Sequence, residues 1–108
     1  MARDILERAD AVAAGVWPRT TAFLTRQALE AAIDQFWLTR VPAMNQCSTR
    51  ARLLALPYYT QVADLGPQVQ LTWTMLSRAC HYRAYELPPT AVQLRGWVDK
   101  VAWVIARV

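Results

Sequence analysis

The segment from Pro18 to Arg40 constrains the fold most, because it has no internal glycine or proline and its apolar residues recur at helical spacing. One line of residues is joined by a second line that widens the apolar face. The first line comprises Leu24, Ala28, Ala31 or Ala32, Gln35 and Leu38, and the second comprises Phe23, Leu29, Ile33, Phe36 and Trp37. A face this broad predicts a central helix that its neighbours contact on more than one side. Pro18 suits the first turn of such a helix, where a missing N–H is harmless.

Prolines and capping residues divide the rest of the chain into shorter helices. We expect a first helix from about Arg3 to Ala14. Ser48 is placed to cap another over Thr49–Leu56. The segment from Tyr58 to Leu65 is expected to add a turn or two, closed by Gly66-Pro67.

The second half of the chain predicts two more helices. Apolar residues at steps of four, three and four mark the first of them: Val69, Trp73, Leu76 and Cys80. Thr90 and Gln93 form a capping box that begins the last helix. Its expected buried side comprises Leu94, Trp97, Val98, Val101, Val104 or Ile105, and Val108. Gly96 lowers helix propensity by about 1 kcal/mol, so we expect it to mark a close contact between helices. The pattern as a whole predicts an all-α fold, a small up-and-down helical bundle of four to five helices in a single domain, residues 1–108.

Composition predicts a partner for this bundle. Hydrophobic residues make up 55% of the 108 residues and charged residues only 19%, which argues against disorder. A core of this size does not bury all of the apolar side chains, and the five tryptophans increase the apolar surface that remains exposed. We therefore expect the chain to form a homodimer.

The distribution of charge and cysteine excludes several classes of protein. The net charge of +4 comes from arginines spread along the chain, without a basic run. Cys47 and Cys80 lack CxxC spacing, and a lone histidine does not complete a zinc site with them, so we expect no metal. No glycine-rich phosphate loop is present, and we expect no cofactor. The N-terminus lacks a signal peptide, and no stretch is long enough to span a membrane, which predicts a cytoplasmic protein with free thiols.

The stretch LSRACHYRAYELPP contains the chain's lone histidine, His81. On a helix, Arg78, His81, Tyr82 and Tyr85 would share one face, beside the core stripe. A histidine there can move a proton near neutral pH, and an arginine one turn earlier can hold a phosphate. Together with Arg83, the tyrosines would add charge and stacking surface for single-stranded RNA. The alternative is a helix-end histidine, with Arg78 paired to Glu86 or Asp99.

Three stretches resemble the HEPN domains, small all-helical modules of prokaryotic toxin–antitoxin and defence systems. They are FLTRQALEAAIDQFW, LSRACHY and the closing TAVQLRGWVDKVAWVIARV. The resemblance implies a dimer that cleaves RNA without metal, with Arg78 and His81 as catalytic residues. It also implies that Tyr82, Arg83 and Tyr85 contact RNA. Only two residues separate Arg78 from His81, fewer than in the family nucleases, and Ala79 replaces the polar residue that usually follows the arginine.

A second function therefore stays open, a non-catalytic helical protein–protein interaction or dimerisation module. Exposed members of the tryptophan and tyrosine set would anchor such an interface. Trp37, Trp73 and Trp97 lie on apolar stripes and are expected in the core. Glu30 and Asp34, one turn apart, are expected to engage Arg26 in a surface ion pair rather than to bind a cation. The partner is thus RNA, an antitoxin or another protein.

Overall fold

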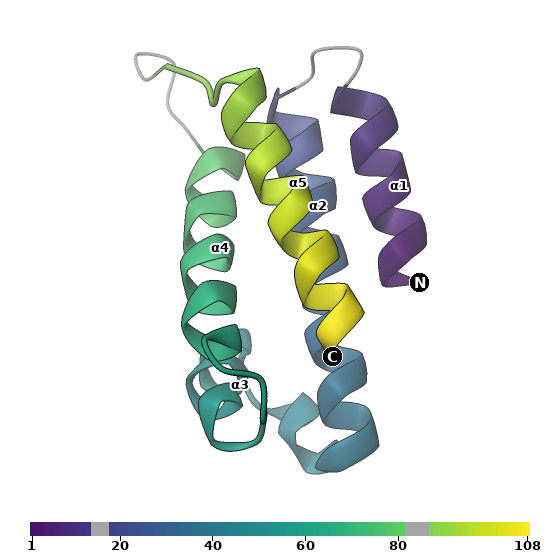
Figure 1. The fold of residues 1–108 in the computed structure, drawn as a ribbon, viewed down its shortest axis with the longest axis vertical. Helices are drawn as coiled ribbons and strands as arrows, with labels where there is room; N and C mark the ends of the chain where they lie inside the picture. Colours follow the sequence, from purple (N-terminus) through teal and green to yellow (C-terminus); the bar gives the residue numbers. More distant parts are fainter. Residues whose placement is uncertain (14–17, 82–86) are drawn as a thin grey trace.

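The computed structural model describes residues 1–13, 18–81 and 87–108, and these residues form five α-helices and two short 3₁₀ helices. The α-helices are α1 (Ala2–Ala13), α2 (Pro18–Arg40), α3 (Thr49–Ala55), α4 (Leu65–Cys80) and α5 (Ala91–Arg107). The described ranges contain no strand. Four long helices alternate in direction, and α3 lies at one end between α2 and α4 (Figure 1). The predicted all-α, up-and-down bundle is confirmed.

Helix α2 is the central element, and its predicted limits are confirmed. It contacts α1, α4 and α5, so the expectation of several neighbours also holds. Its buried residues are Thr21, Ala22, Thr25, Ala28, Leu29, Ala32, Ile33, Phe36 and Trp37. The prediction was wrong for Phe23 and Leu38, which are 50% and 54% exposed. Phe23 and Leu38 lie on the part of α2 that its neighbours leave uncovered.

The segment between α2 and α4 is folded into short pieces at one end of the bundle. A 3₁₀ helix, η1 (Pro42–Gln46), follows α2, and η2 (Leu56–Tyr58) follows α3. The predicted cap of α3 is confirmed, because the Ser48 side chain accepts a hydrogen bond from the Ala51 N–H at 3.2 Å. The predicted helical turns after Tyr58 are replaced by a turn, in which Asp64 has a φ of 66°.

The two glycines of the second half have the opposite roles to those expected. Gly66-Pro67 lies in the first turn of α4 instead of closing the preceding segment. A Cβ at Gly66 would lie 2.5 Å from the Pro57 Cγ, so a glycine is needed for α4 to approach η2. Gly96 is exposed, and a Cβ there would meet no described atom within 4 Å. Its predicted close helix contact is therefore wrong within this chain.

Helices α4 and α5 complete the core. In the capping box of α5, Thr90 Oγ1 accepts from the Gln93 N–H at 3.1 Å, and Gln93 Oε1 accepts from the Thr90 N–H at 2.9 Å. The buried residues of the two helices are Leu65, Gly66, Val69, Thr72, Leu76, Ala79, Cys80, Leu94, Val98, Val101 and Val104. Cys80 is buried, as its place on the apolar stripe predicts, and Cys47 is exposed. Trp37 is fully buried, whereas Trp73 and Trp97 are only partly buried against the core.

No helix in the described part of the chain has the length and apolar character needed to cross a membrane.

Candidate functional site

Arg78 and His81 lie at the end of α4, on the surface. Arg78 is in the last turn of the helix, and His81 is its C-cap residue, with φ −124° and ψ 24°. The His81 backbone N–H donates to the Arg78 carbonyl at 3.1 Å. Both side chains are exposed, and neither lines either of the two grooves described below. The predicted RNA-contacting residues Tyr82, Arg83 and Tyr85 lie outside the described residues.

The alternative pairing of Arg78 with Asp99 is not formed. Asp99 instead lies 3.8 Å from the Arg95 guanidinium, and Arg95 also pairs with Asp10 of α1. Within the described ranges, Arg78 takes part in no ion pair, and Glu86 lies outside them. The pair Arg78 and His81 is therefore open to solvent, without an ion pair from the described residues to hold Arg78 in place.

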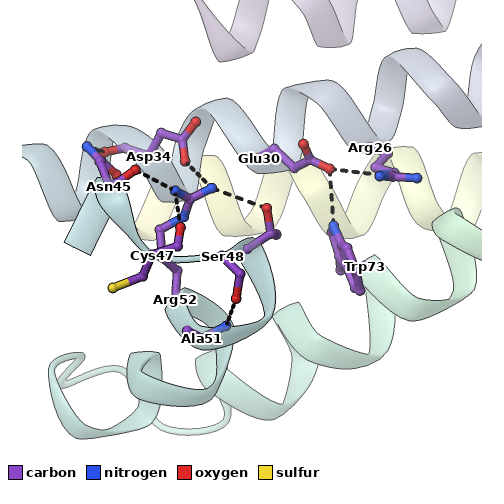
Figure 2. A network of polar contacts seen from close by, with 10 residues as sticks. Arg26, Glu30, Asp34, Asn45, Cys47, Ser48, Ala51, Arg52 and Trp73 are labelled. Carbon is purple, nitrogen blue, oxygen red and sulfur yellow. Dashed lines mark hydrogen bonds and ion pairs between the residues drawn. The ribbon is translucent and has the colours of Figure 1, made fainter.

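A half-buried polar cluster joins α2 to α4 (Figure 2). Glu30 Oε1 accepts from the Arg26 Nε at 2.8 Å, as the predicted ion pair requires, and from the Trp73 Nε1 at 3.2 Å. The Arg26 guanidinium also lies 5.5 Å from the Trp73 ring centroid. The hydrogen bond to Glu30 raises the pKa of Arg26, and burial raises the pKa of the neighbouring Cys80 thiol. The contacts of Glu30 join α2 to α4, and burial, not the neighbouring Arg26, disfavours the thiolate form of Cys80.

A second polar cluster fastens η1 and α3 to α2 (Figure 2). The Arg52 guanidinium lies 3.2 Å from Asp34 Oδ1. It also donates to the backbone carbonyls of Asn45 and Cys47 at 3.2 and 3.1 Å. Asp34 therefore pairs with Arg52, and the expected pairing with Arg26 is made by Glu30 alone. No group of three or more possible metal ligands is present among the described residues.

A groove of about 390 Å³ opens where α1 and α5 stop and α2 continues. Figure 1 shows α2 extending beyond the N-terminus of α1 and the C-terminus of α5. Its apolar lining includes the exposed Met1 and the partly exposed Ala31 and Ile105, with the buried Ala32 and Phe36 at its base, and the exposed Arg3, Gln35 and Thr39 add polar groups. We call this the α1/α2/α5 groove. The volume lies in the range of small-molecule sites in proteins.

A second groove, of about 420 Å³, lies between α1 and α2 and includes three carboxylates, those of Asp4, Glu30 and Asp34. Arg8 and Gln27 also line it. We call it the acidic groove. Met1 and Ala31 line both grooves, so the two are neighbours that differ in charge.

Sequence reasoning missed both the Arg52 cluster and the grooves. Arg52 and Asp34 are distant in the chain, and neither belongs to a local motif. The grooves follow from a difference in helix length, since α1 has 12 residues and α2 has 23. The predicted helix limits already contained this difference in length. It is the sequence feature from which an uncovered end of α2 could have been inferred.

Comparison with known proteins gives no relative from which to assign a function: no family model, curated protein or solved structure matches the chain.

Proposed function

We propose that the chain is a non-catalytic helical module that binds another protein, with the α1/α2/α5 groove as its binding surface. The groove itself carries this proposal, because it combines a concave apolar lining with polar groups that can orient a partner. Arg78 and His81 do not line this groove.

Exposed apolar side chains do not mark a competing binding surface. The large ones are Met1, Phe23, Leu38, Leu54, Tyr58, Tyr59, Leu71, Leu87 and Val92. They are spread over several elements, and single exposed hydrophobic residues are normal on a protein surface. The groove, which Met1 of this set lines, therefore carries the proposal.

Site-specific photo-crosslinking in the source cells tests this function. A photoreactive residue replaces Gln35, which lines the groove and is exposed. The matched control replaces Arg78, which is also exposed but lies at the opposite end of the bundle. We expect Gln35 to yield one saturable crosslinked protein whose binding is reproduced with purified components. Crosslinking at Arg78 alone, or at neither position, contradicts the proposal.

A second candidate function is metal-independent RNA cleavage by a HEPN-like homodimer in a toxin–antitoxin or defence setting. The observation that favours it is the exposure of Arg78 and His81, one helical turn apart, at the end of α4. In this proposal His81 activates the ribose 2′-hydroxyl and Arg78 supports the phosphate. Tyr82, Arg83 and Tyr85 would hold the RNA, and the protein would act in the cytoplasm.

Alanine substitution tests the nuclease function. His81→Ala and Arg78→Ala should each abolish RNA cleavage and toxicity to the cell if this function is correct. Since both residues are exposed, neither change should alter the melting temperature by much. Cleavage that is absent from the native protein, or unchanged in the His81→Ala variant, excludes Arg78 and His81 as a catalytic pair.

A further inference from the structure

The shape of the α1/α2/α5 groove fits a helix more closely than an extended peptide. Its α2 lining extends from Ala31 to Thr39. At 1.5 Å per residue this length corresponds to about 12 Å, or two turns of a partner helix. Ala31 and Ala32 have small side chains, so the backbone of a partner helix can come close to α2 there. An extended peptide would have no free strand edge to pair with, because α2 satisfies its own backbone hydrogen bonds.

The charges around the groove favour an acidic partner. The exposed Arg3 lines the groove, and the Arg40 guanidinium lies 4.1 Å from the ring centroid of Phe36, another lining residue. Among the described lining residues, no side chain carries a carboxylate. Asp4 and Glu30 line the acidic groove, but Arg8 lines it as well and Glu30 is paired with Arg26. The arginines beside the α1/α2/α5 groove therefore attract an acidic partner more than a basic one.

We propose that the α1/α2/α5 groove binds a short amphipathic helix of a partner protein, with apolar residues on one face and glutamates or aspartates beside them. Apolar side chains at helical spacing pack on Met1, Ala31 and Ile105. A flanking carboxylate of the partner pairs with Arg3, and the Gln35 amide donates a hydrogen bond at the groove edge. This inference rests on the proposed function, and it adds the chemistry of the partner.

A pair of designed peptides tests the chemistry. Both have about 15 residues and the same leucine-rich apolar face, and the flanking positions are all Glu in one peptide and all Lys in the other. Fluorescence anisotropy of the labelled peptides measures their binding to the full chain. We expect the acidic peptide to bind more tightly than the basic one, and its affinity to fall as salt is added.

Matched substitutions show which of the two grooves binds the peptide. Gln35→Trp fills the α1/α2/α5 groove and should abolish binding of the acidic peptide. Gln27→Trp is the control, because Gln27 is an exposed residue of the same helix that lines the acidic groove instead. Arg3→Glu should weaken binding about fivefold, the loss expected for one exposed ion pair plus a new repulsion. Arg8→Glu, on the acidic groove side of α1, should leave it unchanged or slightly weakened.

Three results would overturn the proposal. The first is equal affinity for the acidic and basic peptides, or no binding of either at about 1 mM. The second is acidic-peptide binding that survives Gln35→Trp in a variant with native helix content. The third is concentration-dependent self-association that Gln35→Trp removes, which would make a second copy the occupant. A Gln35 crosslink to a partner without an acidic helix refutes the inferred chemistry alone, whereas absence of any such crosslink refutes the proposed function.

Discussion

The two ends of the bundle are built differently. At the end that carries α3, α2 contributes the large residues Phe36 and Trp37, and the Trp37 ring meets that of Tyr59 edge-on at 5.0 Å. At the other end, α2 contributes the small residues Thr21, Ala22 and Thr25 to the interior. Arg52 ties η1, α3 and α2 together at the first end, whereas Arg78 has no described ion pair at the second.

This difference separates residues that hold the fold from residues that are free to bind. Polar side chains at the α3 end are largely committed to contacts within the chain. At the opposite end, Arg95 pairs with Asp10 of α1, whereas the exposed Arg78 has no ion pair among the described residues. The α1/α2/α5 groove combines the advantages of both regions, because a well-packed helix supports it and its polar groups still face solvent. That combination is what a binding site requires.

The largest expected difference between the ends comes from core truncation. Trp37→Ala should lower the free energy of unfolding by about 3–5 kcal/mol, because it empties a fully buried site. Thr21→Val, at the other end, should be neutral or stabilising. The buried Thr21 Oγ1 has no hydrogen-bond partner among the described residues, and valine keeps the shape without the polar atom. Urea denaturation measures both changes, and equal losses would refute the comparison.

The two glycines give the next largest contrast. Gly66→Ala should destabilise the chain by about 1–3 kcal/mol, since its methyl group would collide with the Pro57 ring at the α3 end. Gly96→Ala should stabilise it by about 0.5–1 kcal/mol through helix propensity alone. Thermal melting of the two variants checks the opposite signs. A stabilising Gly66→Ala would mean that α4 and η2 are not in close contact.

Substitution of one arginine at each end tests whether polar contacts contribute more stability at the α3 end than at the opposite end. Arg52→Met should cost about 1–2 kcal/mol, because it removes hydrogen bonds to two carbonyls and the pair with the half-exposed Asp34. Arg78→Met should change stability by less than about 0.5 kcal/mol. Denaturant titration of each variant gives both values. If Arg78→Met costs as much as Arg52→Met, Arg78 has a structural role that its exposed position does not indicate.

The smallest expected effect is the pH dependence due to Cys80. Burial raises its pKa in the folded chain, so the unfolded thiol ionises first as the pH rises. Its contribution to stability is therefore complete below the ordinary thiol pKa and is lost as pH climbs toward the folded value. Cys80→Ala should make stability fall less steeply at alkaline pH, while Cys47→Ala, at an exposed position, should not. Identical pH profiles for the native chain and Cys80→Ala would contradict this.

Local signals predicted the fold well, and signals that depend on distant residues did not. The limits of α2 and the caps at Ser48 and Thr90 were predicted because prolines and capping side chains act on their own segment. The exposure of Phe23 and Leu38 was not predicted, because α2 has apolar residues on several sides and its neighbours decide which side is covered. The need for glycine at position 66 likewise depends on where Pro57 lies.

The candidate site was predicted less well for the same reason. The sequence predicted His81 as a candidate catalytic residue because histidine and arginine chemistry can be recognised from residue type alone. The α1/α2/α5 groove has no such signature, since alanine, phenylalanine and isoleucine form most core surfaces as well. Its position depends on where α1 and α5 end beside α2, which only the assembled bundle reveals.

Amide chemical-shift mapping with the acidic peptide tests the central claim most directly. The claim is that binding occurs where α2 extends beyond α1 and α5, and not at the end of α4. We expect the largest shift changes in residues 31–39 of α2 and in the last turn of α5. The amide shifts of residues 76–81 should not change. Shifts concentrated around Arg78 and His81, with the groove residues unaffected, would contradict it.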